Sequence, residues 1–162
     1  MDHGGRHAGR SWDPLTDALV SSNPTPTLAG ARLVLACEDP PLRDTLAAAL
    51  ALDGHDIVEA RTALDLIHRV GGGPSSRRAP PEVVVLDTSG SRWATLEMLE
   101  AVCGEDWSLP VIALVRARDQ DARGEARRLG AKAVLEIPVD EAALRAEVLA
   151  IVSPVPTHRG AA

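Results

Sequence analysis

Acidic residues follow two apolar runs of the sequence, at the points where these runs end. Glu38 and Asp39 lie just after the run at 33–36, and Asp87 directly follows the run at 83–86. If both runs are parallel strands of one sheet, these carboxylates converge at one edge of it. Two carboxylates and a backbone carbonyl can hold Mg²⁺, an ion that keeps several waters and pairs with phosphate. The alternative is that the acids cap helices or lie solvated in loops, and this is the favoured interpretation for Asp39.

Apolar runs alternate with segments of helical spacing through the middle of the chain. Short, wholly apolar runs are typical of strands that are covered on both faces, as in a parallel sheet. We expect strands at 33–36, 83–86 and 111–115, with weaker candidates at 56–59 and 133–137. The segments between them repeat apolar residues at intervals of three and four, and most end in glycine. This pattern predicts five successive β–α units, and therefore an α/β fold with a doubly wound parallel sheet.

Composition and charge limit the classes of function. The chain has 162 residues, of which 45% are hydrophobic and 25% are charged, as in a folded globular protein. A formal net charge of −6 disfavours general nucleic-acid binding, and the absence of Phe and Tyr leaves few side chains for stacking bases. Cys37 and Cys103 lie far apart without metal-ligand spacing, which excludes a disulfide framework and a zinc module. No apolar run approaches the ~20 residues of a membrane span.

The two ends of the chain differ from its middle. Residues 1–30 and 153–162 are rich in glycine, proline and small polar residues, so we expect disordered tails around one domain at 31–152. We expect no effector domain in the chain. The first 30 residues contain no apolar signal-peptide core, which favours a cytoplasmic protein.

Three stretches of the domain resemble the receiver domain of two-component response regulators, the CheY-like fold. They are LVLACEDPPLRDTLAAALALDGHDIVEA, VVVLDTSGSRWATLEML and LPVIALVRARDQDARGEARRLGAKAVLEIPVD. The resemblance implies a five-stranded flavodoxin-like (βα)5 sheet of strand order 2-1-3-4-5. It also implies that Asp87 is the phosphoacceptor, which takes a phosphoryl group from the phosphohistidine of a histidine kinase. Glu38, Asp87 and the Ser89 carbonyl would then hold Mg²⁺, and Pro138 would follow a cis peptide bond.

The chain departs from this family at several positions of the pocket. Cys37 replaces the first of two paired acids, and a neutral thiol is a poor ligand for a hard cation. Val115 replaces a Thr or Ser whose hydroxyl follows the phosphoryl oxygen, and Val134 replaces the switch aromatic. Ile137 replaces the lysine that pairs with the phosphoryl group.

Three basic features of the sequence bear on these departures. Lys132, the only lysine, cannot replace the missing one, because five residues of strand place it roughly 16 Å away. Arg116 directly follows Val115 and is a candidate phosphate contact, since a guanidinium binds phosphate in a bidentate way. The alternative interpretation is that Arg116 is a solvated loop residue. A basic group on and before the fourth predicted helix is either a face for an acidic partner or a plain solvated face: Arg118, Arg123, Arg127 and Arg128.

Three functions remain open. The leading hypothesis is a pseudo-receiver, a non-enzymatic protein-interaction module in a two-component network with weak or absent Mg²⁺ binding. The second is a functional phosphoacceptor that uses Asp87, Glu38 and Mg²⁺. The third is a flavodoxin-like enzyme that binds a small ligand, which the absence of a Gly-rich phosphate loop disfavours. The first two hypotheses imply a histidine kinase or another signalling protein as partner, and neither implies direct contact with nucleic acid or membrane.

Overall fold

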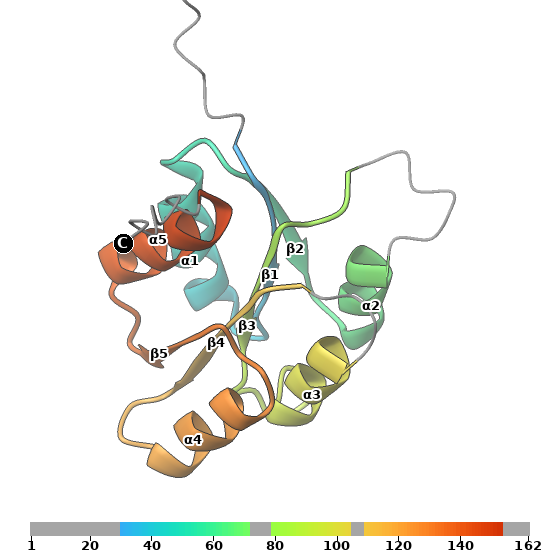
Figure 1. Ribbon diagram of the computed structural model, residues 1–162, viewed down its shortest axis with the longest axis vertical. Helices are drawn as coiled ribbons and strands as arrows, with labels where there is room; N and C mark the ends of the chain where they lie inside the picture. The colour runs from blue at the N-terminus through green and yellow to red at the C-terminus, as the bar shows by residue number, and fades with distance from the viewer. Residues whose placement is uncertain (1–29, 72–78, 105–108, 154–162) are drawn as a thin grey trace, which may run out of the picture.

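The computed structural model describes residues 30–71, 79–104 and 109–153, which form one parallel sheet with helices on both faces (Figure 1). The predicted tails at 1–30 and 153–162 lie outside the described residues except for Gly30 and Ser153. The elements are β1 (Arg32–Ala36), α1 (Pro40–Ala51), β2 (Asp56–Ala60), α2 (Ala63–Gly71), β3 (Val83–Asp87), α3 (Leu96–Gly104), β4 (Val111–Arg116), α4 (Gln120–Arg128), β5 (Ala133–Ile137) and α5 (Glu141–Val152). All five predicted strands are present, including the two weaker candidates.

The sheet has the strand order β2-β1-β3-β4-β5, and every neighbouring pair is parallel. This confirms the predicted α/β class and the order 2-1-3-4-5. Helices α1 and α5 cover one face, and α2, α3 and α4 cover the other (Figure 1). In the register of β1 with β3, Ala36 is opposite Leu86, so Cys37 and Asp87 follow at the same edge of the sheet.

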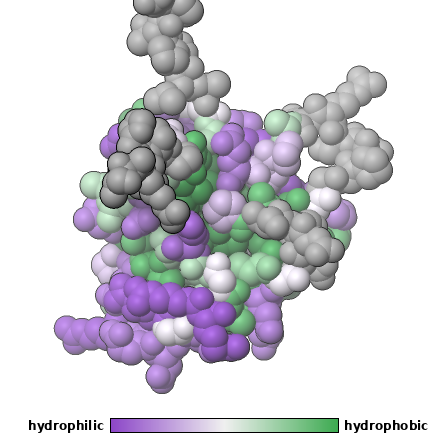
Figure 2. All heavy atoms as spheres, in the orientation of Figure 1, coloured by the Kyte–Doolittle hydropathy of each residue, from purple (hydrophilic) through white to green (hydrophobic). Residues whose placement is uncertain are grey.

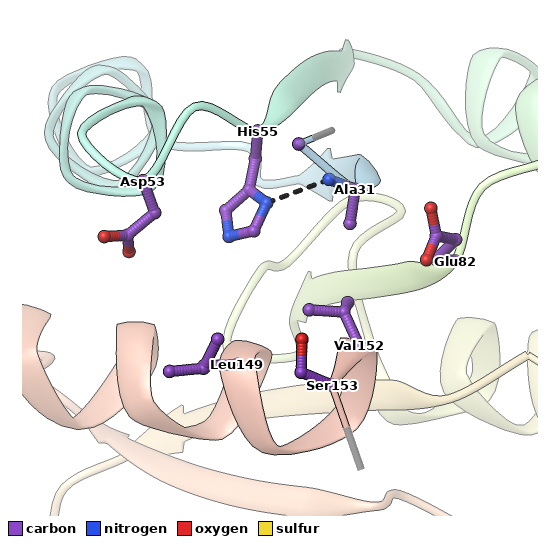
Figure 3. Close-up of a pocket in the computed structure, with 8 residues that line it drawn as sticks. Ala31, Asp53, His55, Glu82, Leu149, Val152 and Ser153 are labelled. Atoms are coloured by element: carbon purple, nitrogen blue, oxygen red, sulfur yellow. Dashed lines mark hydrogen bonds between the residues drawn. The ribbon is translucent and has the colours of Figure 1, made fainter. Parts of the chain in front are cut away.

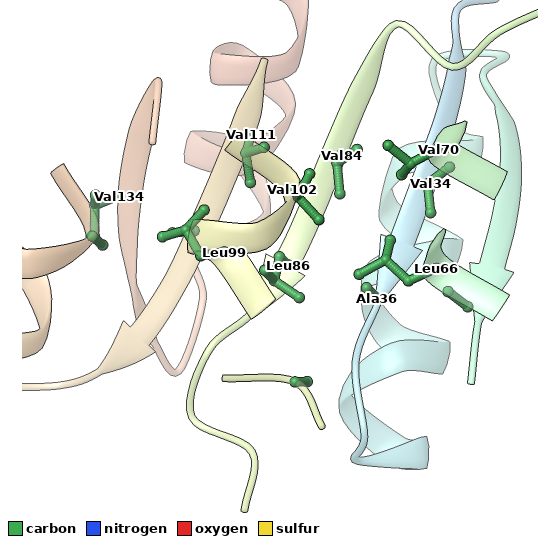
Figure 4. Packing of buried hydrophobic residues seen from close by; sticks show 14 of the residues in the cluster. Val34, Ala36, Leu66, Val70, Val84, Leu86, Leu99, Val102, Val111 and Val134 are labelled. Carbon is green, nitrogen blue, oxygen red and sulfur yellow. The ribbon is translucent and has the colours of Figure 1, made fainter. Parts of the chain in front are cut away.

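Two hydrophobic clusters hold the helices on the sheet, and the strands supply both by period-two alternation. In β1, Val34 and Ala36 belong to the cluster beneath α2, α3 and α4, whereas Leu33 and Leu35 belong to the cluster beneath α1 and α5. Figure 4 shows side chains of the first cluster, with Leu86 on β3 and Leu99 and Val102 on α3. Because the central strands are covered on both sides, they read as continuous apolar runs in the sequence.

Local signals fix the ends of several helices. The side chain of Asp39 accepts from the Leu42 N–H, as predicted for an N-cap, and that of Asp140 accepts from the N–H groups of Ala142 and Ala143 in the same way. The structure adds a third cap, Asp119, on α4. Gly130 turns the chain after α4 with a φ of +108°, a region that favours glycine. Of the helices within the described ranges, none has the length and hydropathy needed to cross a membrane.

The position of Leu86 in the centre of the sheet leads to the first prediction. Leu86 is fully buried, so Leu86→Ala should lower the free energy of unfolding by roughly 2–5 kcal/mol, through lost burial and a residual cavity. Leu52→Ala is the control, because Leu52 is 73% exposed and its truncation should change stability by only about 0.5 kcal/mol. Urea denaturation followed by circular dichroism measures both, and equal losses would contradict the packing described.

Candidate functional site

The Asp87 carboxylate is buried at the end of β3 and is held by three hydrogen-bond donors. The residue is only 2% exposed. Its Oδ1 accepts from the Ser89 backbone N–H at 2.9 Å and from the Ser89 hydroxyl at 2.6 Å. Its Oδ2 lies 3.3 Å from the Cys37 thiol, which donates to it from the end of the neighbouring strand. Both carboxylate oxygens therefore have partners within the chain.

The Cys37 thiol is suited to donate rather than to bind a metal. The residue is fully buried. Burial raises the pKa of the Cys37 thiol to about 12, and the nearby charge and hydrogen bond of Asp87 add to the effect. The thiol therefore keeps its proton at physiological pH and presents a donor to Asp87, where an acid would present a second negative charge.

Glu38 lies at the same edge of the sheet, but its carboxylate binds the loop between β3 and α3. It accepts the backbone N–H groups of Arg92 at 3.0 Å, of Ala94 at 2.8 Å and of Trp93 between them. Burial alone would raise the pKa of Glu38, but the backbone N–H groups together outweigh it and lower this pKa below its ordinary value. Glu38 is thus an ionised anchor for the loop.

Gly90 allows the close approach of Glu38 to this loop. A Cβ atom at residue 90 would lie 2.7 Å from the Glu38 carboxylate and 2.6 Å from the Ala94 carbonyl oxygen. The Ala94 oxygen is backbone and cannot move aside easily, so a side chain at this position would displace the loop. The glycine therefore belongs to the arrangement that commits Glu38 to the amides.

Arg116, the last residue of β4, reaches the same loop from the other side. Its guanidinium Nη2 donates to the Ser89 carbonyl oxygen at 3.1 Å. This is the carbonyl that the sequence resemblance proposes as a metal ligand. Beside the contact lies a cavity of about 250 Å³, whose lining includes Thr88, Ser89, Gly90, Val115, Arg116 and Asp119.

These residues, as arranged, do not fit Mg²⁺. The Glu38 carboxylate is committed to backbone amides, the Ser89 carbonyl accepts from Arg116, and the Asp87 oxygens accept from Ser89 and Cys37. Mg²⁺ requires several oxygen ligands in near-octahedral geometry and takes them directly or through its waters. Within the three described stretches, no group of three or more His, Cys, Asp or Glu side chains is placed to hold a metal ion.

The remaining pocket positions are aliphatic and packed. Val115 is 1% exposed and, with Val134, belongs to the cluster beneath α2, α3 and α4. Ile137 packs against the opposite cluster, and the peptide bond between Ile137 and Pro138 is cis, as expected. The backbone N–H of Lys132 donates to the Val111 carbonyl at the start of β4. This places Lys132 at the far end of the sheet, in agreement with the sequence prediction.

The four arginines of the predicted basic face are partly neutralised. Arg123 forms an ion pair with Glu136 at 3.0 Å, and Arg128 pairs with Glu125. Arg118 has a φ of 64° in the turn before α4 and is exposed, as is Arg127. Figure 2 shows a hydrophilic surface over α4 at the lower edge of the molecule. Because acids are interspersed with the arginines, this face carries both signs of charge.

Sequence reasoning missed Arg43, a buried charge beside the site. Arg43 is 9% exposed, its Nη1 donates to the Cys37 carbonyl at 3.1 Å, and its Nε lies 3.4 Å from the Glu59 carboxylate. It therefore supports the backbone of Cys37 and links α1 to β2. Its signal in the sequence is its position on the helical face that also carries Leu46 and Leu50, both of which are buried.

A second cavity, of about 280 Å³, lies at the opposite edge of the sheet (Figure 3). Leu149 and Val152 of α5 form an apolar side of it, and His55 faces it from the turn before β2. The His55 Nδ1 accepts the Ala31 N–H at 3.1 Å, so the neutral ring carries its proton on Nε2. None of the site residues predicted from the sequence lines this cavity.

Comparison with solved structures finds the same fold in response-regulator receiver domains. The Francisella response regulator 1452 receiver domain has 16% identity and a TM-score of 0.66, over 75% of this chain and 96% of that one. The phosphorylated cyanobacterial phytochrome response regulator RcpA has 15% identity and a TM-score of 0.65, over 78% and 97%. Vibrio cholerae chemotaxis protein CheY4 has 16% identity and a TM-score of 0.65, over 76% and 99%. No protein-family model and no curated protein sequence matches the chain.

The amide contacts of Glu38 lead to a prediction in acid. Because folding lowers the pKa of Glu38, its contribution to stability is present above the ordinary glutamate pKa of about 4.3 and is lost as the pH falls through the lowered value. Glu38→Ala should therefore destabilise the protein at neutral pH, and the difference from the unmodified chain should shrink at roughly pH 3. Glu100→Ala, at an exposed position of α3, is the control. Denaturation curves at the two pH values measure the effect, which a pH-independent difference would refute.

The Cys37 thiol leads to a prediction in alkali. In the unfolded chain a thiol ionises near pH 8.5, but the folded chain holds it protonated up to about pH 12. The contribution of the Cys37 thiol to the free energy of unfolding is therefore complete below about pH 8.5 and is lost as the pH rises towards 12. Cys37→Ser keeps a donor to Asp87 without this titration, so it should reduce the alkaline loss of thermal stability.

Cys103→Ser is the matched control for this experiment. Burial raises the pKa of the Cys103 thiol, but no carboxylate adds to the effect, so this substitution should reduce the alkaline loss less. The measurement is the melting temperature of the three chains at pH 7 and about pH 10. An equal alkaline loss in the Cys37→Ser chain and the unmodified chain would contradict the assigned role.

Proposed function

We propose that this chain, which has the fold of response-regulator receiver domains, is a pseudo-receiver that acts in two-component signalling through protein–protein contacts. Several residues of its phosphorylation pocket differ from those of the family, and the hydrogen bonds within the pocket are not rearranged by phosphorylation. The observation that supports the proposal most directly is the buried Asp87 carboxylate with its three donors from Cys37 and Ser89. A histidine kinase or another signalling protein in the cytoplasm is the proposed partner.

The hydrogen bonds of Asp87 bear on its chemistry as a nucleophile. A carboxylate oxygen attacks phosphorus with a lone pair, and each donor on that oxygen lowers the electron density available. Access is also limited, because Asp87 is 2% exposed. For transfer to occur, the Ser89 or Cys37 donor would have to leave the oxygen that reacts. Both features favour a slow or negligible acceptor.

The neighbours of Asp87 also give little support to a phosphorylated state. Charge-assisted hydrogen bonds to a phosphoryl group are each worth roughly 1.5–3 kcal/mol. Val115 and Ile137 have no polar side-chain atom to form such bonds, and each packs with a hydrophobic cluster. A switch between two conformations spans only a few kcal/mol, so the loss of two such bonds is enough to remove it.

The proposed interaction face includes α4 and the turn before it. Arg118 and Arg127 are exposed there, whereas Arg123 and Arg128 form ion pairs with Glu136 and Glu125. Exposed arginines can bind the carboxylates of a partner in a bidentate way. We therefore propose a partner surface with carboxylates spaced along one helix or loop.

Phosphoryl transfer tests the proposed function. The unmodified chain, incubated with acetyl phosphate and Mg²⁺, should show no stoichiometric phosphorylation by intact mass spectrometry, for the reasons above. A restored variant, Cys37→Asp with Val115→Thr and Ile137→Lys, should become phosphorylated, and adding Asp87→Asn to it should abolish the modification. Stoichiometric modification of the unmodified chain that Asp87→Asn removes would overturn the proposal in favour of a functional phosphoacceptor.

A further inference from the structure

Arg116 donates to the one carbonyl in the pocket that a cation would be expected to use. Its Nη2 lies 3.1 Å from the Ser89 oxygen. The backbone N–H and hydroxyl of the same residue bind Asp87, so the polar groups of Ser89 connect an anion with a cation. Arg116 comes from the end of β4 and Asp87 from the end of β3, which are neighbouring strands.

The loop between β3 and α3 is held by charged side chains from three strand ends. Glu38, after β1, accepts hydrogen bonds from the backbone N–H groups of Arg92, Trp93 and Ala94. Asp87 accepts a hydrogen bond from the Ser89 N–H, and Arg116 donates one to the Ser89 carbonyl oxygen. Each carboxylate thus accepts hydrogen bonds from the loop, and the guanidinium donates one to it. Such charge-assisted hydrogen bonds are stronger than neutral ones.

Charges of both signs meet at this edge of the sheet, where Arg43 donates to the Cys37 carbonyl and Arg116 donates to the Ser89 carbonyl. Glu38, Asp39, Asp87 and Asp119 all lie at strand ends or in the loops that follow them. Asp39 and Asp119 act as helix caps, and Asp87 is buried. A guanidinium keeps its charge at all physiological pH values and needs no dissociable ion to supply it.

We infer that the Arg116 guanidinium is the resident cation of this pocket and takes the place of a divalent metal. It is a positioning residue that fixes the Ser89 carbonyl, and through it the loop, without any bound ion. The inference rests on the proposed function in that both concern the same pocket. It makes a separate claim, because it concerns cation binding rather than phosphoryl transfer.

Magnesium titration followed by NMR of the Ser89 and Gly90 amides tests the inference in four chains. The chains are the unmodified one, Arg116→Ala, Cys37→Asp, and Cys37→Asp with Arg116→Ala. The unmodified chain should show no saturable shift in millimolar MgCl₂ relative to NaCl of equal ionic strength. Removing Arg116 from the Cys37→Asp chain should tighten Mg²⁺ binding roughly tenfold or more, since one charged hydrogen bond no longer competes for the carbonyl.

Two further chains control for general effects of charge and folding. In the Cys37→Asp background, Arg127→Ala removes an exposed arginine of α4 outside the pocket and should leave Mg²⁺ binding unchanged, whereas Arg116→Lys should keep it weak. Equal Mg²⁺ affinity with and without Arg116, or saturable binding to the unmodified chain, would overturn the inference. Neither result requires a phosphoryl donor, so the outcome is independent of whether Asp87 can be phosphorylated.

A direct measurement covers the case in which Cys37→Asp does not fold. The carbonyl carbon shift of Ser89, detected through the Gly90 amide, reports on the hydrogen bond to the Ser89 oxygen. In an otherwise unmodified chain, Arg116→Ala should move this signal upfield, and Arg127→Ala, outside the loop, should not. An unchanged Ser89 carbonyl shift in the Arg116→Ala chain would refute the assigned contact.

Discussion

The burial of the Asp87 carboxylate is the constraint on which the rest of the site depends. β3 is apolar and fully covered until this residue, so the carboxylate emerges at the sheet edge with little access to water. A buried charge without partners is very costly, and here the partners are the Cys37 thiol and two donors of Ser89. The thiol can donate a hydrogen bond only because burial and the nearby anion keep it protonated. Asp87 thus helps to keep the Cys37 thiol protonated, and the thiol in return donates a hydrogen bond to the buried carboxylate.

The same constraint shapes the loop that follows β3. Ser89 turns back to bind Asp87, and the chain must then reach the start of α3 within a few residues. Three of its backbone N–H groups donate to Glu38, which follows β1, and its Ser89 carbonyl accepts from Arg116 of β4, so charged residues at three strand ends hold the loop. Parallel pairing brings these residues together, because the carboxyl ends of all five strands share one edge. The conformation of the loop is therefore a property of the whole sheet edge.

The sequence predicted the backbone of this site better than its side-chain contacts. Apolar runs and the cap at Asp39 predicted the strands and the start of α1 correctly, since burial on both faces and local capping leave direct patterns. The same patterns placed Cys37, Glu38 and Asp87 at one edge. They did not predict that Glu38 binds backbone amides or that Arg116 binds Ser89. Long side chains choose among several rotamers, and tertiary partners decide the choice. Arg43 was missed because charged residues are rarely buried.

Under the proposed function, the aliphatic residues at the predicted pocket positions limit the conformational response that the fold can give. A conformational switch requires groups that interact differently with the two states, because a ligand shifts an equilibrium only by its differential affinity. Val115 and Val134 pack with the helices on one face of the sheet, and Ile137 packs on the other, so each is already engaged in apolar contacts. A new charge at Asp87 would meet no polar side chain at these positions to move. Under the proposed function, specificity therefore resides in the exposed surface, where α4 presents both arginines and acids to a partner.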